Sequence, residues 1–383
     1  LHLCDRRQRQ MCIRDRFQWF GFGSSDDYTS AFGNNFDGYT VIKDSQEYAL
    51  SFGGELTDET LQQIVSDYQQ MEADGMEEEL EKTDWQIVNS WLGTLYPELR
   101  DTSNYKTMIS YVDPDKLTGF YERRQQVLDE FLEVSGQVGA EKEFLHQIER
   151  KVEKPFHYEW VEGWSTLLGS TVADLGVVMA LFLGIVLSSL FAGEWHDNTS
   201  ALVLTTRNGW GKIALAKILT GLAFTVELFA LLAVSNVISQ LFFMGTAGWD
   251  MPIQNIKLIA VAPMNMLQAE IYEYAFVLLG AIGFAGIVMF ISAAVKNNVL
   301  TLLLSLAVVY GPMMIAEYLP YGMQKALDLI PLVGSSTDIF RTNIFRIFGK
   351  LIWSPYLLIT IPVLIGILCM PFAIKSWSRR MKA

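Results

Sequence analysis

Apolar residues dominate the second half of the chain, where they form five runs long enough to cross a lipid bilayer. A membrane helix needs about 20 mostly apolar residues, because each residue advances it by about 1.5 Å and the hydrocarbon core is about 30 Å thick. The predicted spans are 167–192, 218–243, 274–295, 299–316 and 356–374. The pattern therefore predicts an all-α membrane protein, with a polytopic bundle of transmembrane helices over residues 166–383.

Residues 17–165 follow a different pattern, in which apolar positions recur at the intervals of amphipathic helices. Thr57 is a predicted N-cap, and the apolar stripe after it comprises Leu61, Ile64, Val65, Tyr68 and Met71. A second helix is predicted to begin at Asp113, with Pro114 in its first turn. Its buried stripe comprises Leu117, Phe120, Tyr121, Leu128, Phe131 and Leu132. We interpret this region as a large α-rich domain outside the bilayer.

Two connecting segments have compositions typical of the membrane surface. Residues 154–164 lead into the first span and are rich in aromatic side chains, which suit the headgroup layer. Residues 336–352 alternate isoleucine and phenylalanine with Arg341, Arg346 and Lys350. That pattern predicts a helix lying on the membrane.

Charge separates the two halves of the chain. Residues 17–165 carry 30 acidic and 11 basic residues, a net charge of −19, whereas residues 166–383 carry 10 acidic and 13 basic residues, a net charge of +3. Such an acidic domain repels nucleic acid, so we expect no nucleic-acid partner. Basic residues near the spans are equally numerous on the two sides of the membrane, so charge alone does not orient the bundle.

The first sixteen residues, LHLCDRRQRQMCIRDR, have no apolar periodicity, and MCIRDR resembles the translation of a sequencing-library adapter. We interpret residues 1–16 as a non-native scar. The natural start of the protein is then expected to be missing.

Motifs for catalysis or metal binding are not found in the sequence. The nearest approach to a phosphate-binding loop, Gly209–Ile213, lacks both the four-residue spacer and the Ser/Thr after lysine. The polar run Glu194–Asp197 contains metal-ligand side chains, but adjacent polar residues at the end of a span are typically solvated. We predict no catalytic residue, no metal and no bound cofactor in this chain.

Two carboxylates within the predicted spans, Asp174 and Glu227, are candidates for a translocation path. A carboxylate at membrane depth is costly and normally faces a bundle interior or a wet cavity. Asp174 also fits a hydrated position near one membrane surface. An intramembrane aspartyl protease, an alternative, would use the same two residues as a pair.

The stretch FAGEWHDNTSALVLTTRNGWGKIALAKI at 191–218 resembles the signature loop of ABC-2-type permeases. In that family a span ends in a Glu-containing turn of small residues, followed by a short helix, a Thr/Ser-plus-basic turn and a lysine that opens the next span. The corresponding residues here are Gly193, Glu194, Asn198, Thr199, Thr205, Thr206, Arg207, Lys212 and Lys217. Asn198 stands where glycine is commoner.

This resemblance implies the permease subunit of an ATP-driven ABC-2-type exporter in the plasma membrane. The 194–217 loop is then cytoplasmic and contacts a separate ABC subunit, which binds ATP and Mg²⁺. Glu194, Arg207 and Lys212 are the leading candidates for that contact. A second permease copy, identical or different, completes the assembly within the membrane lipid. Residues 17–165 are then extracytoplasmic and the C-terminus cytoplasmic, and the family's first of six helices is expected upstream.

A competing hypothesis is a membrane-anchored sensor or envelope interaction protein whose external domain binds a peptide. Five or six helices are more than an anchor requires. An ATPase partner is what separates the two hypotheses.

Overall fold

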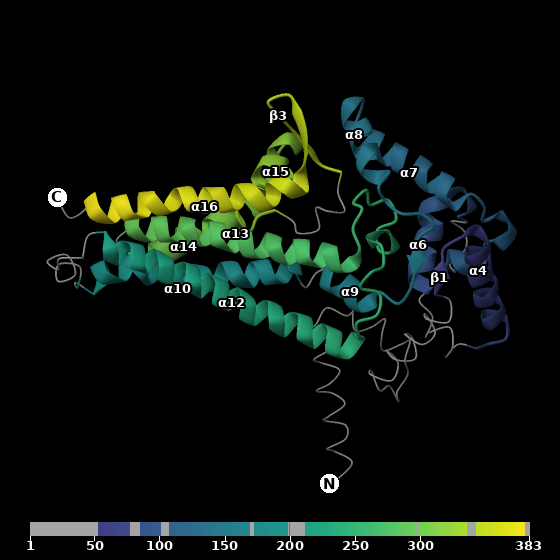
Figure 1. Ribbon diagram of the computed structural model, residues 1–383, viewed down its shortest axis with the longest axis horizontal. Helices are drawn as coiled ribbons and strands as arrows, with labels where there is room; N and C mark the ends of the chain where they lie inside the picture. The colour runs from purple at the N-terminus through teal and green to yellow at the C-terminus, as the bar shows by residue number, and fades with distance from the viewer. Residues whose placement is uncertain are drawn as a thin grey trace, which may run out of the picture. The chain divides into compact units, whose positions relative to one another are not determined.

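The computed structural model describes residues 53–76, 85–100, 107–168, 172–197, 199, 211–295, 297–334 and 342–379. They form two compact units. The first comprises Leu1–Thr171 and Ser239–Glu270, and the second comprises Val172–Ile238 and Ile271–Ala383. Most of the described residues are helical (Figure 1), in agreement with the predicted fold class.

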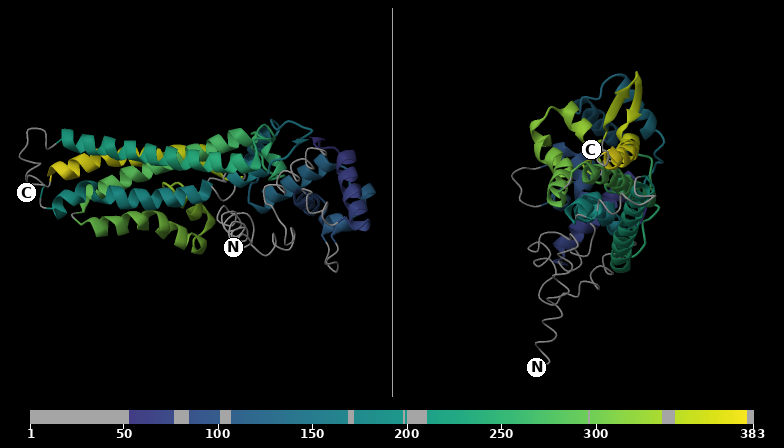
Figure 2. Two further views of the ribbon diagram at one scale, coloured as in Figure 1. Left: turned by 90° about the horizontal axis from the view of Figure 1, so that it is seen from below. Right: turned by 90° about the vertical axis from the view of Figure 1, so that its left-hand side faces the viewer.

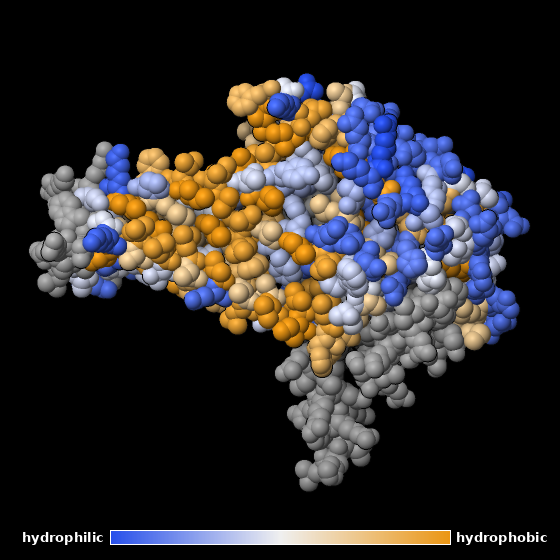
Figure 3. All heavy atoms as spheres, viewed as in Figure 1, coloured by the Kyte–Doolittle hydropathy of each residue, from blue (hydrophilic) through white to orange (hydrophobic). Residues whose placement is uncertain are grey.

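Five long helices dominate the second unit, and each is long and apolar enough to cross a membrane, as predicted. They are α10 (Val172–His196), α12 (Lys212–Met244), α13 (Met266–Ala294), α14 (Asn298–Ile315) and α16 (Ser354–Arg379). Figures 1 and 2 show them side by side with similar axis directions. On the face seen in Figure 3, hydrophobic residues cover most of the surface of these helices. This is the surface expected of helices in contact with lipid.

Helix α13 is the most buried of the five, and glycines bring it into direct contact with α16. A Cβ atom added at Gly283 would lie 2.3 Å from the carbonyl oxygen of Pro362, and one added at Gly286 would lie 2.4 Å from that of Gly366. Both distances are far below a van der Waals contact. Only glycine therefore permits this approach, which small residues commonly provide between membrane helices.

We predict that Gly286→Ala destabilises the protein by about 1–3 kcal/mol, because its methyl group must push α16 away from α13. Gly311→Ala in α14 is the matched control, since a Cβ there meets nothing within 4 Å. That change should be neutral or stabilising, because alanine is the better helix former. Thermal unfolding in detergent measures both, and equal melting temperatures for the two variants would refute the contact.

The segment between α14 and α16 departs from the sequence prediction. After η6 (Ala316–Tyr318) and α15 (Tyr321–Leu327), the chain forms an antiparallel hairpin of β3 (Ile344–Ile347) and β4 (Lys350–Trp353). The surface helix predicted over 336–352 is therefore wrong for residues 342–352, the part of this segment that the structure describes. Its bulky β-branched and aromatic residues favour a strand, and a two-residue turn ending in glycine favours a hairpin.

Four helices of ten or more residues lie in the described part of the first unit. They are α4 (Asp58–Ala73), α6 (Trp85–Leu95), α7 (Phe120–Val134) and α8 (Ala140–Glu149). Short pieces join them: α9 (Glu162–Thr166), the paired strands β1 (Gly54–Glu55) and β2 (His157–Tyr158), and the 3₁₀ turns η1 (Pro97–Leu99), η2 (Met108–Ser110), η3 (Pro114–Lys116) and η5 (Ile253–Asn255).

The predicted N-cap of α4 is confirmed, because the Thr57 hydroxyl accepts a hydrogen bond from the Thr60 backbone N–H at 3.2 Å. The second predicted helix begins later than expected. Asp113 caps only the 3₁₀ turn η3, and α7 starts at Phe120 after Gly119, whose φ is +71°. A left-handed residue interrupts an α-helix, so the seven residues from Asp113 to Gly119 form a separate turn.

Aromatic residues of the 154–164 segment, which suit the headgroup layer by composition, are buried within the first unit. Phe156, Tyr158, Trp160 and Trp164 are all buried. The Trp160 indole donates a hydrogen bond to the Met244 carbonyl at 3.4 Å, and the Trp164 indole donates one to the Thr246 carbonyl at 3.3 Å. Their polar atoms thus find partners within the protein.

The connection between α12 and α13 also belongs to the first unit, although the sequence division placed it with the spans. Asn255 in this connection is buried, and its side-chain amide donates to the His157 carbonyl at 2.9 Å. The Trp91 indole of α6 donates to the Asn255 carbonyl at 3.2 Å. These bonds join segments 98 and 164 residues apart.

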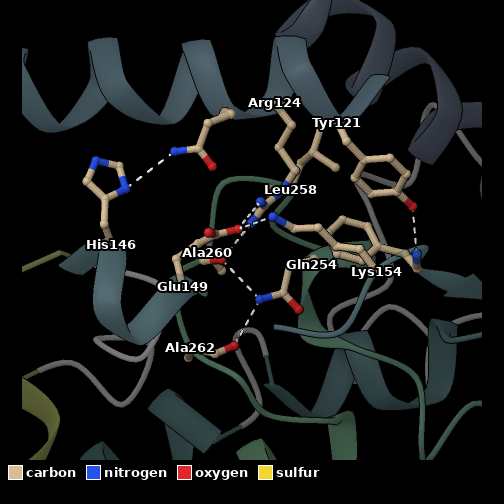
Figure 4. A network of polar contacts seen from close by, with 11 residues as sticks. Tyr121, Arg124, His146, Glu149, Lys154, Gln254, Leu258, Ala260 and Ala262 are labelled. Atoms are coloured by element: carbon tan, nitrogen blue, oxygen red, sulfur yellow. Dashed lines mark hydrogen bonds and ion pairs between the residues drawn. The ribbon is translucent and has the colours of Figure 1, made fainter. Parts of the chain in front are cut away.

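Arg124 of α7 is the centre of a buried polar network in the first unit (Figure 4). Its guanidinium forms an ion pair with Glu149 at 2.6 Å and donates to the carbonyls of Leu258 and Ala260 at 2.7 and 3.2 Å. Lys154 approaches the same Glu149 oxygen at 2.8 Å. The network therefore fixes the α12–α13 connection against α7 and α8.

Burial lowers the pKa of Arg124, although the hydrogen bond with Glu149 opposes that shift. Burial alone would raise the pKa of Glu149, but hydrogen bonds from Lys154 and Arg124 outweigh it and lower the pKa below its ordinary value of 4.5. A carboxyl group whose pKa is lowered by folding stabilises the folded state. This contribution is fully present at pH values above the pKa that the group has in the unfolded chain. This contribution is lost as the pH falls through the lowered pKa.

We predict that Arg124→Met destabilises the first unit by about 3–5 kcal/mol, because it strips a buried carboxylate of its main partner. Adding Glu149→Leu should recover part of that loss, because the unpaired carboxylate is then removed as well. The double variant should therefore lose less stability than the two single variants lose together. Glu98→Gln, which breaks a more exposed pair with Arg123, should change stability by about 1 kcal/mol or less. Chemical unfolding measures the four variants, and strict additivity would contradict the network.

Candidate functional site

The predicted coupling residues surround the end of α10 and the start of α12. The structure describes Glu194, Thr199, Lys212 and Lys217. The other four fall outside the described residues: Asn198, Thr205, Thr206 and Arg207. The site is therefore built from the helix ends on either side of the 200–210 segment.

Helix α10 ends where its apolar sequence gives way to the polar run Glu194–Asp197. The backbone N–H of Thr199 donates to the Glu194 carbonyl at 3.0 Å, which satisfies one of the unpaired carbonyls of the last turn. Helix α12 begins at Lys212, whose side chain is exposed. Lys212 is thus available to a partner in solution.

Lys217 and Glu194 form an ion pair between the two helix ends. The Lys217 Nζ atom lies 2.6 Å from a carboxylate oxygen of Glu194, and the two side chains are only 15% and 20% exposed. Lys217 also donates to the Leu190 carbonyl in the last turns of α10. A cation is favoured there, because the C-terminal end of a helix carries partial negative charge.

Aromatic rings enclose the same ammonium group. Lys217 Nζ lies 5.2 Å from the ring centre of Phe191 and 5.4 Å from that of Trp377, distances typical of cation–π contacts. Trp377 belongs to the last turns of α16 and is completely buried. The ends of α10, α12 and α16 therefore meet at one side chain.

Helix α13 joins this group through Ser292. Its hydroxyl donates to the Ser188 carbonyl at 2.8 Å and accepts from the backbone N–H groups of Phe191 and Ala192 at 3.0 and 3.1 Å. We call Glu194, Lys217, Phe191, Trp377 and Ser292 the Lys217 cluster. It connects four membrane helices at one end of the second unit.

Sequence reasoning named two members of the Lys217 cluster and missed Phe191, Trp377 and Ser292. Their roles depend on contacts between helices, which have no signature in the sequence. One signal was present: Lys217 lies one and a half turns inside an apolar helix, where a lysine requires a partner.

The two path candidates lie at different depths. Lys217 and Glu194 mark a common level on the neighbouring helices α12 and α10. Glu227 is ten residues from Lys217, about 15 Å along α12, and Asp174 is twenty residues from Glu194, about 30 Å along α10. On helices that cross a core about 30 Å thick, these intervals would place Glu227 near the middle and Asp174 near the opposite surface. This separation disfavours the paired carboxylates of an aspartyl protease.

Asp174 and Glu227 both have exposed side chains. Neither one faces the interior of the helix bundle formed by this chain. Asp174, in the first turn of α10, fits the hydrated position near one membrane surface. Glu227 instead lies near the middle of α12 (Lys212–Met244), and its side chain is exposed.

Comparison with known proteins identifies no relative, because no family model, curated protein or solved structure matches this chain. Among the described residues, no three His, Cys, Asp or Glu side chains are grouped so as to hold a metal ion. Function is therefore argued from the membrane helices and the Lys217 cluster.

We predict that Lys217→Met destabilises the protein by about 2 kcal/mol, because it leaves a largely buried Glu194 carboxylate without its counter-charge. Lys212→Met is the matched control on the same helix. Its side chain is exposed, so the change should stay within about 0.5 kcal/mol. Melting temperatures in detergent report both effects, and a similar small loss for the two lysines would show that the cluster contributes little.

Proposed function

We propose that this chain is the permease subunit of an ABC-2-type transporter, an exporter powered by a separate ATP-binding subunit. The proposal rests on the resemblance of residues 191–218 to the signature loop of that family and on five helices of membrane-spanning length. In this assignment the 194–217 loop and the C-terminus are cytoplasmic. The acidic residues 17–165 are extracytoplasmic.

The Lys217 cluster, beside the proposed coupling loop, is the structural observation that supports this proposal. A partner that closes on ATP must transmit a push on this loop to the membrane helices. A flexible helix end would absorb that displacement locally. Here the cluster connects α10, α12, α13 and α16 at this end, so a push on the loop is transferred to the bundle as a whole.

The translocation path, in this proposal, is formed between two permease copies that rock against each other. Glu227 supports that arrangement, because it is exposed on α12 in a single chain. An uncovered carboxylate at mid-membrane requires a partner or a wet cavity. Asp174 would lie at the extracytoplasmic mouth of such a path.

The experiment that tests the proposal is purification of the tagged full-length protein from its native membrane in mild detergent. We predict that an ABC-type ATPase co-purifies and that the complex hydrolyses ATP. An Arg207→Ala/Lys212→Ala variant should co-purify with several-fold less of the ATPase subunit, because charged loop residues set docking specificity. Neither residue is a member of the Lys217 cluster, so we expect the variant to melt like the wild type.

Lys257→Ala serves as the control, because it removes an exposed lysine of the first unit. It should leave the amount of bound ATPase unchanged. Purification of the wild-type chain without any ATPase would overturn the proposal and favour the membrane sensor.

A further inference from the structure

The turn of the β3–β4 hairpin combines two locally unfavourable features at Phe348. Phe348 and Gly349 both have positive φ, +49° and +78°. Two-residue turns of this kind normally take asparagine or aspartate before glycine, because a larger residue is strained in the left-handed region. Phe348 is also fully exposed, at 102% of its reference area. Within the described residues, no contact compensates either feature.

The base of the hairpin is fixed to the start of a membrane span. Strand β4 continues into α16 without an intervening residue, and the Ser354 N–H donates to the Asn343 carbonyl at 3.0 Å. Trp353, the last residue of β4, is buried. With four residues in each strand, the tip lies about 13 Å from this base. Figure 1 shows the hairpin extending to the side of α16, away from the bundle.

The chemistry of the tip matches a lipid headgroup layer. Arg346 and Lys350 flank the turn with exposed side chains, and residues 342–353 include no acidic residue. An aromatic ring beside basic groups suits the boundary between acyl chains and anionic phosphates. Tyr318, which follows α14 on the same side of the membrane, is exposed as well.

We propose that the hairpin tip inserts into the headgroup layer of the membrane that α16 crosses. Phe348 enters the boundary with the acyl chains, and Lys350 lies against lipid phosphates. Membrane is the occupant that the position favours, because the hairpin begins where a span ends and extends sideways from it. The inference depends on α16 as a membrane helix and not on the proposed transport function.

The test is the depth of a fluorescent label at position 348. The full-length protein carries Phe348→Cys, with Cys4, Cys12 and Cys369 replaced by serine, and is reconstituted into phosphatidylcholine vesicles containing phosphatidylglycerol. Cysteine placed at Val138, which is exposed in the first unit, gives the aqueous reference. Cysteine placed at Leu368, which is exposed within α16, gives the hydrocarbon reference. Lipids with a headgroup-level spin label and aqueous iodide are the two quenchers.

We expect the headgroup spin label to quench position 348 several-fold more than position 138, and more than position 368. Quenching by iodide alone, as expected at position 138, would place the tip in water and overturn the proposal. Protection from both quenchers would mean that another protein covers the tip, which also overturns it. Omitting phosphatidylglycerol and adding Lys350→Gln should each lower the quenching by the headgroup label. No change for Lys350→Gln would overturn the contact of Lys350 with lipid phosphate.

A second variant separates membrane insertion from folding. Phe348→Asn removes the ring and places a residue that tolerates positive φ in the turn. Because Phe348 is fully exposed, this variant and the labelled one should melt in detergent no lower than the wild type. A lowered melting temperature for Phe348→Asn would show that the ring packs within the protein, contrary to the proposal.

Discussion

The second unit depends on how closely α13 can approach α16. Between helices in lipid there is no hydrophobic driving force, so association relies on van der Waals packing and hydrogen bonds. Gly283, Gly286 and Gly366 let the two backbones touch, and this contact makes α13 the buried centre of the bundle. Helix α10 packs against α14 and joins the same hydrophobic cluster as α13 through apolar residues such as Leu183 and Leu187.

A second constraint is the need to satisfy backbone carbonyls where regular structure ends. Arg124 and Gln254 donate to the carbonyls of Leu258, Ala260 and Ala262 in the irregular connection after α12. Lys217 donates to a carbonyl near the end of α10. In each case a long polar side chain supplies the donor that a helix would have provided. A buried carbonyl without a donor is costly, so these few side chains determine the path of the chain at both places.

Sequence patterns predicted the local features well, because hydropathy and capping act over neighbouring residues. The five spans and the Thr57 cap are present in the structure. The β3–β4 hairpin was missed because its basic and apolar residues also fit a helical period, and the Phe348 turn lacks the usual asparagine. The burial of the tryptophans in 154–164 was not predicted, because it depends on the α12–α13 connection, 84 and 82 residues away in sequence. In the candidate site, Glu194 and Lys217 were named individually, but their pairing around Trp377 is a tertiary property.

Glu227 is the residue that a single chain does not explain. Helix α12 has 33 residues, and every stretch of about 20 residues within it, the length that crosses the hydrocarbon core, includes Glu227. Centring α12 on the core therefore places this carboxylate near the middle of the membrane. Its face of α12 is exposed, and Ala216, Thr220, Ala223 and Ala230 lie along the same face. Small residues permit a close helix–helix approach around a polar group, whereas exposure to acyl chains costs a carboxylate about 2.5–3.5 kcal/mol. The balance favours coverage of this face by protein or water, and a path between two copies would supply it.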